Sequence, residues 1–184
     1  MKYLKIGALL LPLIFIGGMG FIYSGIYPMG ADVPHNKLTY WVLETLRERS
    51  VARAAAGIVV PANLNDSERL LKGGADYNDM CASCHLKPGK FESDFSIGLY
   101  PKPPNLALPK EEHDHDHKSD EMASAARQFW IIKHGIKASG MPAWGLTHDD
   151  DRIWSMVAFI QRLSELNSDQ YQIITAREEG DGHH

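Results

Sequence analysis

Residues 81–85 read Cys81-Ala82-Ser83-Cys84-His85, and this stretch decides how the rest of the 184-residue chain is interpreted. Two cysteines separated by two residues and followed by histidine form the pattern by which haem is attached to a protein chain. The spacing lets both sulfurs reach one edge of the porphyrin, and the adjacent imidazole then lies beneath the iron. The chain has no other cysteine, so two thioether bonds would use both thiols. A redox-active dithiol and half of a zinc site are the alternatives that such a cysteine pair leaves open.

Four separated features carry a resemblance over residues 66–167. They are the 81–85 stretch, Pro88-Gly89, Tyr100-Pro101-Lys102-Pro103-Pro104-Asn105-Leu106, and Gly135 with Gly140-Met141-Pro142-Ala143-Trp144-Gly145. In these features the chain resembles a class I, single-haem cytochrome c. The resemblance implies an all-α fold, with three to five helices around one covalent haem c. It also implies that Met141 is the sixth iron ligand, and that the carbonyl of Pro88 accepts a hydrogen bond from the ring N–H of His85.

The residues themselves offer two candidate donors for the second axial position of the iron. Met141 follows a glycine and precedes a proline in a predicted loop, where the backbone is restrained and the side chain can point inward. Its thioether is a soft donor that suits ferrous iron and raises the reduction potential. His134 is the competitor, because a second imidazole would give a haem of lower potential. An open or water-bound position is the third alternative.

Further residues are candidates for the haem pocket. Tyr100, Trp144 and Trp130 carry O–H or N–H groups that can bond the haem propionates, and ordinary aromatic packing is the alternative. Pro104 lies in a proline-rich stretch that either closes one edge of the haem or forms a plain loop. Five lysines flank these segments and either steer an acidic partner or serve solubility; they are Lys87, Lys90, Lys102, Lys133 and Lys137.

The N-terminus reads as a membrane anchor over residues 1–30. Lys2 and Lys5 precede an uncharged run from Ile6 to Ile26. A helix of about 21 residues is long enough to cross a hydrocarbon core of about 30 Å, so the run predicts a transmembrane helix. Because lysines stay on the cytoplasmic side, the rest of the chain is expected on the periplasmic side of a bacterial cytoplasmic membrane. A cleaved secretory signal is the alternative, although no A-x-A site follows the run.

The remaining chain divides into three predicted segments. Residues 31–64 form a juxtamembrane helix, in which Leu38, Val42 and Leu46 recur every four residues, and an extended linker. Residues 65–170 form the haem domain, and residues 171–184 form a tail.

Inside the haem domain, helices are predicted to begin near residues 66, 119 and 147. Gly74 lies on the inner face of the first helix, so we expect it to allow a close approach of the last one. Thr147 and Asp150 have the spacing of a capping box for that last helix.

One insertion departs from the resembled pattern. Residues 111–117 read Glu111-Glu112-His113-Asp114-His115-Asp116-His117. Imidazoles and carboxylates at this density can bind copper, nickel or zinc weakly, which makes His113, His115 and His117 a candidate secondary metal site. A solvated, pH-sensitive loop is the alternative.

Together these features predict a membrane-tethered, single-electron carrier rather than an enzyme, because a six-coordinate His/Met iron has no open position for a substrate. The expected partners are redox proteins such as a terminal oxidase or a dehydrogenase. The net charge of −4 gives no basic footprint for nucleic acid. Two other classes stay open: a haem enzyme or gas- or peroxide-binding protein in which Met141 is labile, and a copper-handling protein that uses the histidine-rich insertion.

Overall fold

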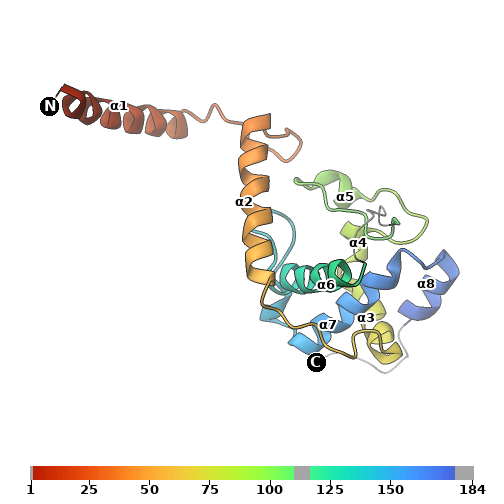
Figure 1. Ribbon diagram of the computed structural model, residues 1–184. Helices are drawn as coiled ribbons and strands as arrows, with labels where there is room; N and C mark the ends of the chain where they lie inside the picture. The colour runs from red at the N-terminus through yellow and green to blue at the C-terminus, as the bar shows by residue number, and fades with distance from the viewer. Residues whose placement is uncertain (1, 110–116, 177–184) are drawn as a thin grey trace. The chain divides into compact units, whose positions relative to one another are not determined.

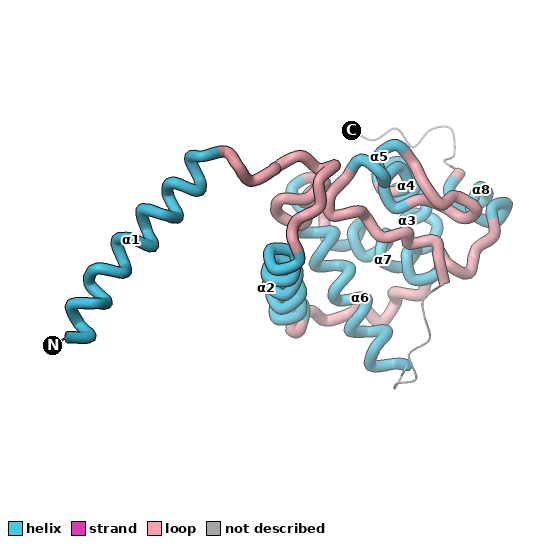
Figure 2. The backbone as a smooth tube through the Cα atoms, turned by 90° about the horizontal axis from the view of Figure 1, so that it is seen from above, coloured by secondary structure: helices cyan, strands magenta, loops and turns pink. Residues whose placement is uncertain are grey.

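The computed structural model describes residues 2–109 and 117–176. Helices are the only regular elements in these two ranges (Figure 2), so the predicted all-α class is confirmed. The elements are α1 (Lys2–Ser24), α2 (Lys37–Ala55), α3 (Ser67–Met80), α4 (Ala82–His85), α5 (Asp94–Gly98), α6 (His117–His134), the short 3-10 helix η1 (Trp144–Leu146), α7 (Asp150–Leu163) and α8 (Ser168–Thr175). The chain divides into two compact units, Met1–Pro34 and His35–His184.

The first unit consists of α1 and the segment after it. α1 is a helix of 23 residues that contains Pro12. Its apolar side chains Leu11, Ile14 and Phe15 are each at least 68% exposed. Among the described residues, no helix combines the length and the apolar character needed to cross a membrane. The transmembrane helix predicted from Ile6 to Ile26 is not confirmed.

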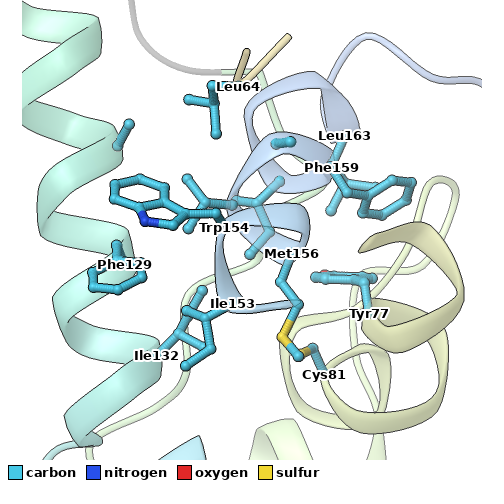
Figure 3. Close-up of a cluster of buried hydrophobic side chains, with 14 of the residues drawn as sticks. Leu64, Tyr77, Cys81, Phe129, Ile132, Ile153, Trp154, Met156, Phe159 and Leu163 are labelled. Carbon is cyan, nitrogen blue, oxygen red and sulfur yellow. The ribbon is translucent and has the colours of Figure 1, made fainter. Parts of the chain in front are cut away.

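In the second unit, α7 is the central helix and packs against both α3 and α6 (Figure 1). Most of its side chains between Ile153 and Leu163 are buried. Figure 3 shows how Tyr77 of α3 and Phe129 of α6 approach α7 from two directions, with Cys81 at one edge of the same cluster. The cluster therefore places the first cysteine of the 81–85 stretch directly against the main core.

α3 and α7 cross at Gly73, where a side chain has no room. A Cβ atom at this position would lie 1.8 Å from the backbone oxygen of Ser155. Gly74, which was predicted to lie at the crossing, faces Phe159 of α7 as well as Ile174 of α8. The predicted close approach of the two helices is thus confirmed, and it is tightest one residue earlier, at Gly73. Neighbouring residues differ by only about 100° around a helix, so an apolar pattern defines a face better than a single position.

One buried ion pair joins the same two helices. Asp76 is only 4% exposed, and its carboxylate accepts hydrogen bonds from Nε and Nη2 of Arg152 at 2.7 and 2.8 Å. The backbone N–H of Arg152 donates to Asp149 at 2.8 Å, which makes Asp149 the N-cap of α7. The predicted capping box is wrong, because the hydroxyl of Thr147 donates to the carbonyl of Trp144 in the preceding turn.

α2 belongs to the second unit and packs against α6. Asn36 caps it, accepting a hydrogen bond from the N–H of Thr39. Its buried side chains are Val51 and Ala55. The apolar positions from which this helix was predicted are largely exposed, 70% for Leu38, 47% for Val42 and 66% for Leu46. The helix is confirmed, but the face that contacts the rest of the unit differs from the apolar stripe.

α8 was not predicted, and the expected domain boundary at residue 170 lies inside it. Asn167 and Gln170 form a capping box at its start. Tyr171 is 2% exposed, and its hydroxyl donates to the side-chain oxygen of Asn78 in α3 at 3.1 Å. Residues 171–175 are therefore part of the compact unit rather than a tail.

Candidate functional site

The stretch from Cys81 to His85 forms one helical turn at the end of α3. The N–H of Cys84 and that of His85 both donate to the carbonyl of Cys81, at 3.1 and 2.8 Å. Both thiols are free, Cys81 being buried and Cys84 half-buried. Burial, with smaller contributions from Asp76 and Cys84, raises the pKa of the Cys81 thiol to about 12, which keeps this group protonated in the folded chain.

His85 is held at its ring and at its backbone by the proline-rich segment. Its Nδ1 lies 2.9 Å from the carbonyl oxygen of Pro104, and its own carbonyl accepts a hydrogen bond from the N–H of Leu106 at 3.1 Å. Because a carbonyl oxygen can only accept, Nδ1 must carry the proton and Nε2 presents its lone pair. Burial lowers the pKa of this imidazole, and the hydrogen bond to Pro104 offsets the effect only in part. The ring is therefore neutral and suited to binding a metal through Nε2.

The expectation for Pro88 is wrong. Leu86, directly after the histidine, has a φ of 68° and turns the chain away from the ring. The Pro88 carbonyl accepts a hydrogen bond from Ser168 Oγ at 3.3 Å instead. The acceptor for His85 thus comes from a segment 19 residues later in the chain, which no local pattern around residues 81–89 indicates.

A large cavity brings together residues from distant parts of the second unit. It encloses about 260 Å³ and opens to solvent. Ligand pockets usually occupy about 300–1,000 Å³, so this cavity is close to the lower end of that range. Cys81, Cys84, His85 and Met141 all line it. Its other walls are mostly apolar, with Leu99, Leu106, Ile131, Ile132, Ile136 and Ile160 among the lining residues.

The loop that carries Met141 is fixed by its own hydrogen bonds. The N–H of Met141 donates to Ser139 Oγ at 3.1 Å, and its carbonyl accepts from the N–H of Ile136 at 3.2 Å. Gly135 has a φ of 65°, and a Cβ on it would lie 2.7 Å from the Met141 oxygen, so both its conformation and its surroundings require glycine. Met141 is therefore presented to the cavity by a closed loop.

The other candidates from the sequence divide into two groups. Pro104 and Trp144 line the cavity, whereas Pro88, Tyr100, Trp130 and His134 are not among its lining residues. The Tyr100 hydroxyl accepts a hydrogen bond from the N–H of His35 at 3.2 Å. His134 is exposed and its ring lies against Trp130 in a tilted arrangement, with centroids 5.0 Å apart, so the structure does not bring it to the site as a competing ligand.

Sequence reasoning missed two charged residues of the cavity wall, Arg47 of α2 and Arg127 of α6. They lie 80 residues apart in the chain, and neither has a motif around it. Of the predicted secondary metal site, His113, His115 and the side chain of His117 lie outside the described part of the chain.

Residues 68–160 match the protein family described as cytochrome c oxidase, cbb3-type, subunit III, which is just over half of the 184-residue chain. The chain belongs to this family. As a cbb3-type subunit III family member, it contains a cytochrome c domain, which implies a covalently bound haem c. No curated protein and no solved structure matches the chain.

The residues of the cavity fit this cofactor. Two free thiols stand on the same helical turn as the histidine, which satisfies the chemistry of attachment. The proton on Nδ1 of His85 is bonded to a carbonyl oxygen, so the other nitrogen is available to iron. Apolar walls suit the flat face of a porphyrin. All four of these cavity residues, Cys81, Cys84, His85 and Met141, lie within the matched range 68–160.

Proposed function

We propose that this protein is a single-electron carrier, in which Cys81 and Cys84 hold one haem c and His85 and Met141 ligate its iron. The observation that carries the proposal is that these four residues line one cavity, although Met141 comes from a loop 56 positions after His85. When bound, the haem supplies a centre that takes up and releases one electron.

The surrounding chain supports electron transfer rather than catalysis. The Pro104 carbonyl fixes the orientation of the His85 ring, and the closed loop around Ser139 fixes Met141. With both axial positions filled from the chain, no position is left for a substrate. A neutral thioether favours ferrous iron, so a moderate to high reduction potential is expected.

Spectroscopy of the intact protein tests this proposal. We expect the absorption bands of a low-spin, six-coordinate haem c in both oxidation states, a weak near-infrared band from sulfur bonded to ferric iron, and slow, poor binding of carbon monoxide. The haem should remain attached after denaturation and solvent extraction, because the thioether bonds are covalent. Avid carbon monoxide binding by the unmodified protein would instead support a haem enzyme or gas-binding protein.

We further propose that the electron acceptor is a terminal oxidase and that the haem domain operates on the periplasmic side of the cytoplasmic membrane. The family description names an oxidase subunit, which supports an oxidase as the partner. The uncharged run from Ile6 to Ile26, together with the exposed apolar side chains of α1, supports attachment to the membrane through residues 1–30.

The attachment has a direct test. The mature protein is expected to keep residues 1–30, to sediment with membranes and to be released by detergent but not by salt. A matched protein in which a cleavable secretory signal replaces residues 1–30 should be released without detergent. A mature chain that begins beyond Gly20 would contradict the attachment and favour a removed signal.

A further inference from the structure

Part of the wall of the haem cavity is charged, and the charged residues come from outside α3 and α4. Arg47 of α2 and Arg127 of α6 both line the cavity, and their side chains are only 33% and 34% exposed. Glu48 of α2 links them, since Nη2 of Arg47 lies 3.0 Å and Nη2 of Arg127 2.8 Å from its carboxylate. Burial raises the pKa of Glu48, but the hydrogen bonds from the two arginines outweigh it and leave this pKa below its usual value.

α2 is held in place independently of these charges. Val51, 1% exposed, and Ala55, 6% exposed, are its buried residues, and they lie one turn or more beyond Arg47 on a helix that packs against α6. α2 also lies wholly outside residues 68–160, the segment that matches the family. Arg47 is thus outside the matched domain.

The negative charges of the haem need cations as partners in this wall. Each haem c carries two propionate carboxylates, on the half of the macrocycle away from the vinyl groups that become thioethers. A carboxylate in a mostly apolar cavity is costly unless it is paired. Guanidinium groups are the preferred partners, because their planar set of donors matches a carboxylate with two parallel hydrogen bonds. Among the described residues, the cationic groups that line the cavity are Arg47, Arg127 and Lys102.

We propose that Arg47 and Arg127 bind a haem propionate, so that α2 forms part of the haem site and tunes the haem electrostatically. This inference rests on the proposed haem binding through Cys81 and Cys84. The two guanidinium groups hold the propionate in its ionised form and add positive charge beside the porphyrin. Glu44 and Glu48, which are bonded to Arg47, limit that positive charge.

A purely structural role is the competing explanation, in which the arginines only join α2 to α6 through Glu48. The two explanations differ in their effect on the haem. Removing an arginine near a bound propionate favours ferric iron and lowers the potential, whereas removing the Glu48 charge does the opposite. A structural ion pair predicts that the arginine and glutamate substitutions weaken the fold in the same way and leave the potential unchanged.

The test is the reduction potential of the holoprotein between pH 5 and pH 10, measured for Arg47→Gln, Arg127→Gln and Glu48→Gln. The potential falls with rising pH where a propionate ionises, and loss of either arginine should move this transition up by about one pH unit or more. Above the transition both arginine variants should have a lower potential than the parent, and Glu48→Gln a higher one. Arg47→Lys, which keeps the charge, should recover most of the parent potential.

Arg49→Gln is the matched control, because Arg49 is exposed on the same helix and does not line the cavity. Arginine variants whose potential and pH transition equal those of Arg49→Gln would overturn the inference. A shift of the potential in Glu48→Gln in the same direction as in the arginine variants would also overturn the inference. If the proposed function itself were wrong, the parent protein would lack covalent haem or a reversible one-electron couple. That result differs from either outcome above.

Discussion

Replacing Met141 by alanine is expected to open the iron to external ligands and to lower the reduction potential. In our proposal the thioether of Met141 is the sixth ligand, and it stabilises ferrous iron. Axial ligands set haem potentials over a range of about 0.8 V, so a decrease on the order of 0.1 V or more is expected. The near-infrared sulfur band should disappear, and carbon monoxide or cyanide should bind quickly. The haem itself should stay attached through Cys81 and Cys84.

Met122→Ala is the control for this substitution, because Met122 is half exposed on α6 and does not line the cavity. It should keep the sulfur band and the parent potential. A sulfur band that survives in Met141→Ala would show that another residue ligates the iron. If Met141→Ala lost the sulfur band but kept the parent potential, the thioether would be a ligand that does not raise the potential. That result would contradict the role given to it here.

Replacing Gly73 by alanine is expected to cost about 3 kcal/mol of folding free energy, which is the upper part of the range for overpacked cores. The new Cβ would lie 1.8 Å from a backbone oxygen of α7, so α3 and α7 must move apart because no side chain can yield. Alanine is also the better helix former by about 1 kcal/mol, so a net loss of stability could arise only from the crossing. Denaturant unfolding followed by far-ultraviolet circular dichroism measures the effect.

Alanine substitutions at two other glycines are the controls for that experiment. At Gly98 nothing lies within 4 Å of a Cβ position, so Gly98→Ala should unfold like the parent protein. Gly74→Ala should have an intermediate effect, because the nearest atom, Cγ2 of Ile174 at 3.0 Å, belongs to a side chain that can shift. Equal stability of the Gly73 and Gly98 variants would mean that the two helices separate easily.

Local patterns in the sequence predicted the long helices because such patterns depend on residues a few positions apart. The stop of α6 before Gly135 and the start of α3 after Asp66 are both of this kind. α8 was missed although its signal was present, since Asn167 and Gln170 have the spacing of a capping box. A helix of eight residues gives too short a pattern to distinguish it from a disordered end.

Contacts between distant segments could not be predicted in the same way. The carbonyl that bonds the His85 ring belongs to Pro104 rather than to the nearby Pro88, which lies just beyond the positive φ of Leu86. Arg47 and Arg127 meet at Glu48 only because α2 packs on α6. Nothing in either segment alone indicates this meeting, since both are ordinary charged stretches of helix.

The burial of Tyr171 sets the length of chain that a working fragment must contain. Its ring lies 6.4 Å from that of Tyr77 and 6.0 Å from that of Phe159, measured between centroids. A fragment cut at the end of the family match, after Ile160, would lack α8 and leave both of these aromatic side chains uncovered. Such a fragment would tend to aggregate, because newly exposed apolar surface promotes association. Fragments for spectroscopy or fusion should therefore extend at least to Thr175.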